Sequence, residues 1–261
     1  YAFVAGTKRA GLLVPARKER WKQRLLDAWI PFDNDDTHTV RMHLALLAAI
    51  GVAPVAEVVP SWSREDEARA QALTAPLGAE RYVVMHPYPK FRYKMWTPQG
   101  WSDVARWLQD RGLHVVLTGG PDAAEREYVS RIASQVPDAL NLTGALTLGG
   151  VACVISRAAA YIGPDTAITH AAAALGVPTV ALFGPSNPVK WGPWPAGHDA
   201  DTNPWQLKGS QASGRVRLVQ GAGACVPCRN EGCDKHVESS SDCLVNMSSV
   251  TVIAALSEVL R

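Results

Sequence analysis

The sequence predicts an α/β protein built around a mainly parallel β-sheet. Between residues 80 and 220, short apolar segments of strand length alternate with amphipathic segments of helix length. Glycine and proline stand between these segments, where turns are expected. Strands that alternate with helices form βαβ units, which build parallel sheets. With 261 residues, 47% of them hydrophobic and 19% charged, the chain suffices for one large or two ordinary α/β domains.

The first part of the sequence contains only fragments of a sheet, FVAG and GLLVP, and we assign residues 1–60 to a partial N-terminal domain. TVRMHLALLAAIGV predicts a helix, because its apolar residues recur at helical spacing and Gly51 ends it. Two prolines and a run of mixed charge follow, and we assign residues 61–79 to a linker that leads into a helix.

The regular alternation lies in residues 80–245, which we assign to a second domain, followed by a C-terminal helix over residues 246–261. The segments that predict strands are RYVVMHP, LHVVLTGGP, ALNLTG, AYIGPD, PTVALFG and RVRLVQ. The segments that predict helices are PQGWSDVARWLQDRG, DAAEREYVSRIASQV, LTLGGVACVISRA, DTAITHAAAALG and SSVTVIAALSEVLR.

Composition and charge narrow the class of protein further. No apolar segment approaches the roughly 20 residues that a helix needs to span a bilayer, and the opening YAFVAGTKRAG lacks the order of a secretory signal. The net charge of +2 is uninformative, but residues 1–24 hold seven basic residues against the single acid Glu19. One interpretation is that this cluster attracts an anionic acceptor or a membrane surface. The other is that it is the solvated face of a helix that buries Trp21, Leu25 and Trp29.

In parallel sheets, ligands bind at the carboxyl ends of the strands, where loops lead into helices. GPDTAITH is such a loop, and Asp165 or Thr166 can cap the helix that follows. The free N–H groups of the first turn and the helix dipole then form an anion site, which His170 reaches from one turn further on. A capped helix with a satisfied histidine is the alternative. Because other polar loops converge here, we favour a diphosphate site.

The turn TGGP follows another strand and contains Gly119 and Gly120. It lacks the full G-x-G-x-x-G pattern of dinucleotide sites, but the two glycines allow a ligand to approach the backbone closely. Glu125 lies in the first turn of the next helix. Its carboxylate either compensates the helix dipole or accepts hydrogen bonds from ribose hydroxyls.

Two further loops follow strands of the same sheet. HPYPKFRYKMW carries Lys90, Arg92 and Lys94, three cations that could neutralise a diphosphate. FGPSNPVKWGPWP is rich in proline and tryptophan, and is either a pocket wall or a rigid surface loop.

Four cysteines are spaced closely near the end of the chain, in a segment that spans residues 225–243 and contains His236. Without a secretory signal, such a cluster favours a structural zinc site or reduced thiols over disulfides. The predicted zinc ligands are Cys225, Cys228, Cys233 and Cys243. Cys153 stands apart in an apolar helix and is predicted to be a core residue.

The stretch YIGPDTAITHAAAALGVPTVALFGPSNP resembles the C-terminal signature of glycosyltransferase family 9, the ADP-heptose:lipopolysaccharide heptosyltransferases. The family pattern has Asp-Thr-Gly, a His three residues further, an Ala-rich helix, a Pro-initiated strand and Phe-Gly-Pro. The resemblance covers residues 80–261 and, more weakly, the first 55. It implies a GT-B fold, with two Rossmann-like domains facing a cleft. The N-terminal domain is then incomplete in this chain, and residues 80–245 are the nucleotide-sugar domain.

The resemblance also implies roles for individual residues. Lys94 and Asp165 are the implied catalytic residues, with Lys94 stabilising the diphosphate leaving group. Ala167 departs from the family pattern, which has glycine there. Including the two glycines of the TGGP turn, the implied donor-binding residues are Lys94, Gly119, Gly120, Glu125, Asp165, Thr166, Ala167 and His170.

The implied reaction is inverting transfer of a heptose from an ADP-sugar donor to a lipopolysaccharide-core acceptor. The family's general base is an Asp in a loop after the first N-terminal strand, and we find no matching segment in this sequence. The implied mechanism requires no metal cofactor for catalysis, because Lys94 and the helix N-terminus at Asp165 stabilise the leaving group. A nucleotide-sugar-binding module without turnover and another GT-B enzyme, such as a nucleotide-sugar epimerase, are the alternatives.

The partners implied are a nucleotide-sugar donor and an anionic glycolipid. Nucleic acid is not expected, because the net charge is weak and no basic-aromatic face is evident. We expect a cytoplasmic protein with peripheral contact to the cytoplasmic face of the inner membrane.

Overall fold

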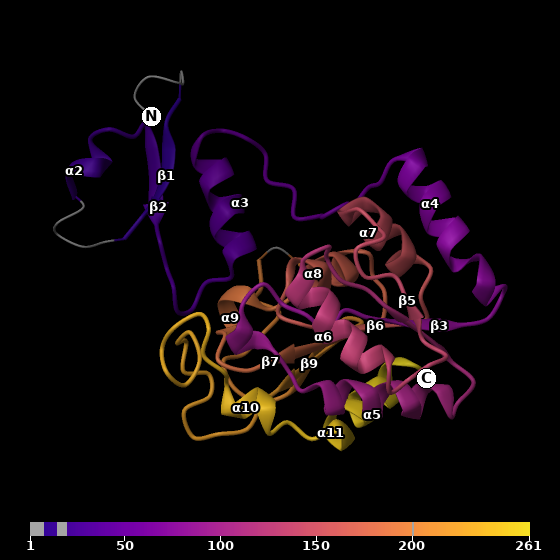
Figure 1. The fold of residues 1–261 in the computed structure, drawn as a ribbon. Helices are drawn as coiled ribbons and strands as arrows, with labels where there is room; N and C mark the ends of the chain where they lie inside the picture. The colour runs from indigo at the N-terminus through magenta and orange to yellow at the C-terminus, as the bar shows by residue number, and fades with distance from the viewer. Residues whose placement is uncertain (1–7, 15–19, 200) are drawn as a thin grey trace.

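The computed structural model describes residues 8–14, 20–199 and 201–261. The N-terminal part contains two parallel strands, β1 (Ala10–Leu13) and β2 (Ala28–Pro31), with the short helix α2 (Arg20–Gln23) between them. Helix α3 (Thr39–Ala49) packs on both strands. Figure 1 shows this small unit standing to one side of the larger domain.

A seven-stranded sheet forms the centre of the larger domain, in the order β5-β4-β3-β6-β7-β9-β8. All neighbouring strands are parallel except the edge pair β8–β9, which is antiparallel. The predicted α/β class with a mainly parallel sheet is therefore confirmed. The strands are β3 (Tyr82–Met85), β4 (His114–Leu117), β5 (Leu140–Asn141), β6 (Ala160–Pro164), β7 (Thr179–Phe183), β8 (Gln211–Ser213) and β9 (Val216–Gln220).

Helices cover both faces of this sheet, because successive strand residues point to opposite faces and both sets are apolar. Val83 and Met85 face the side covered by α5, α6 and α11, whereas Tyr82 and Val84 face α4, α7 and α8. The helices are α4 (Arg64–Thr74), α5 (Pro98–Gln109), α6 (Ala123–Ala133), α7 (Leu148–Ser156), α8 (Ala167–Ala174), α9 (Pro188–Trp191), α10 (Asp242–Val245) and α11 (Ser249–Val259). Two short 3₁₀ helices, η2 (Ala75–Leu77) and η3 (Arg92–Lys94), complete the set.

The segment that we predicted as a linker, residues 61–79, contains α4 and η2. A capping box of Ser63 and Asp66 begins α4. The helix packs on α7, and Arg157 at the end of α7 forms an ion pair of 2.6 Å with Glu67. The boundaries that we assigned to the domains stay predictions.

The basic N-terminal stretch does not bury an apolar helix face. Helix α2 ends at Gln23, and the chain then enters β2 because its backbone pairs with β1. Trp21 and Trp29 are 59% and 39% exposed, and Leu25 is also exposed. The interpretation of these three residues as a buried helix face is therefore wrong. Arg17 and Lys18 lie outside the described residues.

Within the described ranges, no helix has both the length and the apolar character needed to cross a membrane.

Candidate functional site

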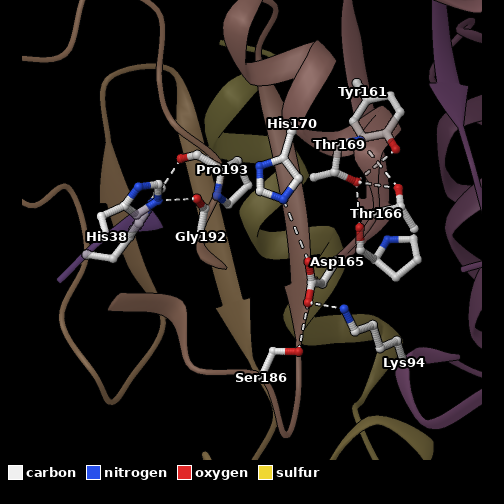
Figure 2. Close-up of polar contacts among 12 residues, drawn as sticks. His38, Lys94, Tyr161, Asp165, Thr166, Thr169, His170, Ser186, Gly192 and Pro193 are labelled. Atoms are coloured by element: carbon white, nitrogen blue, oxygen red, sulfur yellow. Dashed lines mark hydrogen bonds and ion pairs between the residues drawn. The ribbon is translucent and has the colours of Figure 1, made fainter. Parts of the chain in front are cut away.

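Asp165 lies at the centre of a polar cluster between β6 and α8 (Figure 2). Its side chain is only 8% exposed. The Lys94 ammonium lies 2.6 Å from Oδ2, and the Ser186 hydroxyl donates to the same oxygen at 2.7 Å. His170 Nε2 lies 3.7 Å from Oδ1, beyond hydrogen-bond length.

Strand order explains why these groups meet. Strand β6 lies between β3 and β7, so the loops that leave the carboxyl ends of these three strands are neighbours. The loop after β3 carries Lys94 in η3, the loop after β6 carries Asp165, and the loop after β7 carries Ser186. The predicted convergence of loops at this edge of the sheet is therefore confirmed.

The pKa of the Asp165 carboxyl is lowered to about 2. Burial by itself raises this pKa, but His170 and the Lys94 ammonium outweigh burial. At 2.6 Å, we regard Lys94 as the stronger of the two partners, because His170 is more distant. Asp165 is therefore ionised at neutral pH. Its carboxylate fixes the position of the Lys94 ammonium.

A buried hydroxyl network fixes the turn into α8. Thr166 is the N-cap, and its Oγ1 accepts from the Thr169 N–H at 3.4 Å. Thr169 Oγ1 in turn donates to the Pro164 carbonyl at 2.5 Å and lies 2.9 Å from the Tyr161 hydroxyl. A Cβ on Gly163 would lie 2.1 Å from that hydroxyl, so only glycine fits there. The capping role that we predicted for Asp165 or Thr166 falls to Thr166.

A groove of about 630 Å³ runs along the loops after β3 and β4 to the start of α8. A Cβ on Gly120 would lie 2.7 Å from the Glu125 carboxylate, which would then have to shift. Burial raises the pKa of Glu125. The predicted donor residues that line this groove are Gly119, Gly120, Glu125, Thr166 and Ala167.

A second cavity, of about 390 Å³, lies on the other side of the α8 N-terminus. Lys94, Asp165 and Ser186 line it, together with Trp191. The two hollows meet at the Asp165–Thr166 peptide, because Asp165 lines one and Thr166 lines the other. The loop FGPSNPVKWGPWP is thus a pocket wall, which was one of its two predicted interpretations.

The three predicted cations are not equivalent in the structure. Only Lys94 pairs with Asp165. Lys90 lines the larger groove, and Arg92 lines neither hollow. Sequence reasoning also missed His86, a buried side chain that lines the groove and whose Nδ1 lies 3.0 Å from Thr118 Oγ1. Burial lowers the pKa of His86 to about 4, so it is neutral at pH 7.

The N-terminal unit docks beside this site through the loop between β2 and α3. Asn187 Nδ2 donates to the Asp35 carbonyl at 2.9 Å, and the Lys190 ammonium bonds to the Asn34 side chain. His38 is 1% exposed, its Nε2 lies 2.8 Å from the Gly192 carbonyl oxygen, and burial lowers its pKa to about 4. These contacts join segments about 150 residues apart, and no local pattern in the sequence signals them.

The structure does not confirm the predicted zinc site in the cysteine-rich segment. Cys225, Cys228, Cys233 and Cys243 are free thiols. No group of three or more His, Cys, Asp or Glu side chains in the described ranges is placed to hold a metal ion. Burial, with a smaller contribution from the neighbouring cysteines, raises the pKa of the Cys243 thiol to about 11. Cys153 is buried in the core, as predicted.

The strand order and the helices on both faces of the mainly parallel sheet define a Rossmann-like α/β fold. Residues 2–208 match the model of glycosyltransferase family 9 (heptosyltransferase), and the chain belongs to this family. The predicted family is thereby confirmed.

Named relatives agree with this assignment. Lipopolysaccharide heptosyltransferase 3 of Escherichia coli is 33% identical over 165 residues, which cover 60% of this chain and 47% of that protein. Lipopolysaccharide heptosyltransferase 1 of Pseudomonas aeruginosa is 34% identical over 185 residues, which cover 71% of this chain and 49% of that protein. The chain spans about half the length of the curated relatives it matches.

Solved structures establish the fold. ADP-heptose lipopolysaccharide heptosyltransferase II of Escherichia coli matches with a TM-score of 0.65 at 22% identity, over 92% of this chain and 67% of that one. Escherichia coli heptosyltransferase WaaC with ADP matches with a TM-score of 0.63 at 19% identity, over 96% of this chain and 65% of that one. The predicted GT-B fold class is confirmed, and the chain covers part of that fold.

Proposed function

We propose that the protein is an inverting glycosyltransferase that transfers a heptose from ADP-heptose to a lipopolysaccharide-core acceptor. The observation that carries this proposal is the position of the Lys94–Asp165 pair, at a helix N-terminus between two hollows. One hollow can take a nucleotide and the other a sugar. Family membership and relatives named as lipopolysaccharide heptosyltransferases support the choice of donor and acceptor.

In this proposal the larger groove holds the nucleoside diphosphate. Glu125 accepts hydrogen bonds from the ribose hydroxyls, and the turn at Gly119 and Gly120 lets the donor approach the backbone. The N–H groups at Thr166 and Ala167 face the diphosphate, which the dipole of α8 stabilises. His170 supports Asp165 from the next turn.

The transfer step exchanges one bond at the anomeric carbon for another. A general base takes the proton of an acceptor hydroxyl, whose oxygen attacks the anomeric carbon while the bond to the diphosphate breaks. Lys94 and the α8 N-terminus stabilise the charge that develops on the departing diphosphate. We assign no general base among the described residues, and Asp165, which is engaged by Lys94 and Ser186, serves to position Lys94.

The test is a transfer assay with ADP-heptose and lipopolysaccharide from a heptose-deficient strain. We expect a heptosylated product of inverted anomeric configuration. A matched binding measurement uses ADP and calorimetry, in which Asp165→Ala is expected to lose most of the affinity. Equal ADP affinity in variant and parent would reduce Asp165 to a purely structural role.

A nucleotide-sugar-binding module without turnover is the second candidate. The observation that favours it is that Asp165, the buried carboxylate of the site, is already engaged by Lys94 and Ser186. Tight ADP-heptose binding without hydrolysis or transfer by the intact protein would select this candidate over the enzyme.

We also propose a cytoplasmic location with peripheral contact to the inner membrane. The contact surface is the basic segment around Arg20, Lys22 and Arg24, with the exposed rings of Trp21 and Trp29. Sedimentation with anionic phospholipid vesicles tests this placement. Binding that is lost on adding salt supports it, whereas equal binding to neutral vesicles contradicts it.

A further inference from the structure

The cavity beside Lys94 extends beyond the groups that a donor requires. Lys94 and Asp165 line it where the proposed diphosphate meets α8. Arg229 and Glu231 of the cysteine-rich segment also line it, and the exposed ring of Trp191 forms part of the wall. A cation, a carboxylate and an aromatic ring in one hollow suit a sugar that carries both charge and hydroxyl groups.

The backbone of Arg229 is tied to the part of this cavity that Asp165 lines. Its N–H donates to the Pro185 carbonyl at 2.8 Å, and the next residue, Ser186, donates to Asp165. Arg229 has a φ of +62°, a left-handed conformation that non-glycine residues adopt only when their surroundings hold them. The guanidinium is therefore presented from a fixed point beside the site.

The guanidinium already binds a carboxylate, that of Asp35 in the docked N-terminal loop. Both side chains are well exposed, at 44% and 60%, so this ion pair contributes little to stability and can be exchanged. Asp33 Oδ1 accepts the Asp35 N–H at 2.8 Å, which fixes the loop that presents the carboxylate. The fork of N–H donors on arginine matches a phosphate or a carboxylate equally well.

We propose that Arg229 binds an anionic substituent of the acceptor sugar, and that Asp35 is the internal carboxylate that this substituent displaces. The inference rests on the proposed function, because it specifies the acceptor side of the same site. Glu231 accepts hydrogen bonds from sugar hydroxyls on the same wall. Its negative charge restricts the acceptor's anion to the Arg229 side. Arg229 is thus a residue that selects charged acceptors.

The test measures acceptor binding without donor, and acceptor KM with ADP-heptose, for lipopolysaccharide from a heptose-deficient strain. Arg229→Gln is expected to raise the acceptor Kd about tenfold or more, while the ADP Kd is unchanged. Asp35→Asn is expected to lower the acceptor Kd by roughly two- to fivefold, because it frees the guanidinium.

Opposite effects of the two substitutions separate this role from a structural ion pair. If the pair only held the loop in place, both substitutions would shift acceptor affinity in the same direction, and the inference would be overturned. Arg217→Gln is the matched control, because it breaks another exposed ion pair, Arg217–Glu258 at 3.0 Å, on β9 and α11. We expect it to leave acceptor affinity unchanged.

Modified acceptors show whether the anion that Arg229 binds is a phosphate or a carboxylate. Phosphatase treatment removes phosphate charge, and amidation removes carboxylate charge. The modification that removes the bound group should weaken binding to the parent and have no further effect on Arg229→Gln. If neither modification weakens the parent, the inference is wrong. Failure of the parent to transfer heptose would overturn the proposed function, whereas the binding measurements still decide the role of Arg229.

Discussion

The domain around the seven-stranded sheet and the unit that precedes it are stabilised in different ways. In the larger domain both faces of the sheet are covered, and Val83 and Val84 on opposite faces are fully buried. Of the described residues before residue 60, only Leu13, His38 and Met42 are buried. The N-terminal unit instead exposes Trp21 and Trp29.

This difference shows which interactions stabilise each region. The larger domain has a continuous apolar core, which is the dominant source of stability in folded chains. The N-terminal unit is held beside it by polar contacts of the loop between β2 and α3, such as those of Asn187 and His38. The residues proposed to bind donor and acceptor belong to the larger domain, whereas the docked loop contributes Asp35, the carboxylate that the acceptor's anion is proposed to displace.

The largest expected effect compares two tryptophans. Trp101 is fully buried against Trp96 in the larger domain, whereas Trp21 stands on the surface of the N-terminal unit. Trp101→Ala should lower the free energy of unfolding by about 3–5 kcal/mol, and Trp21→Ala by no more than about 0.5 kcal/mol. Chemical denaturation measures both. A comparable loss in the two variants would break the comparison between the regions.

The next effect concerns catalysis by the larger domain. Lys94→Ala should lower the transfer rate by about 10²–10³-fold and change ADP affinity much less, because its charge acts on the leaving group. Lys90→Ala is the control, since Lys90 lines the nucleotide groove and does not pair with Asp165. Steady-state kinetics with saturating donor separate the two variants. An unchanged rate in Lys94→Ala would remove it from the mechanism.

Acid should loosen the docking contact. Burial lowers the pKa of His38 in the folded protein to about 4, below the ordinary histidine value of 6.5, so the unfolded or undocked form binds the proton more tightly. The docking free energy is therefore fully present above pH 6.5 and declines as the pH falls toward 4, by about 3 kcal/mol at most. Hydrogen exchange of residues 33–38 across this range measures the change.

His38→Gln keeps a donor for the Gly192 carbonyl and removes the titrating group. We expect its docking to be independent of pH between 6.5 and 4. His86 also has a pKa of about 4 but lies in the larger domain, so its titration should affect global unfolding rather than docking. If His38→Gln retained the full pH dependence of exchange in residues 33–38, another group would be responsible.

The smallest expected effect is that of a chelator. Because Lys94 and the α8 N-terminus supply the positive charge at the leaving group, EDTA should leave the transfer rate unchanged. Metal analysis of the purified protein tests the predicted zinc in the same sample. If zinc is bound and its removal lowers the melting temperature, the larger domain is stabilised by a metal site outside its sheet as well as by its apolar core.

The sequence predicts the larger domain well because its signals are local. Apolar runs such as YVVM and the loop GPDTAITH each carry their own pattern of burial, turn and cap. The placement of Glu125 after a glycine turn follows from the same local pattern. Of these residues, Glu125 and Thr166 line the groove.

The remaining features depend on contacts that are distant in sequence. The strands β2 (AWIP) and β8 (QAS) lack a buried apolar run such as YVVM, because their residues are half-buried or exposed. Ser186 becomes a partner of Asp165 only because β6 and β7 are neighbours, and His38 meets Gly192 only through docking of the two regions. The cysteine spacing suggested a metal site, but spacing alone does not fix where the thiols point.

The junction of Asp165 and Thr166 is a wall that two hollows share. Asp165 lines one hollow, and Thr166, the next residue, lines the other. The Thr166 cap and the buried hydroxyls of Tyr161 and Thr169 hold this turn. A change that loosens the turn therefore alters both hollows together.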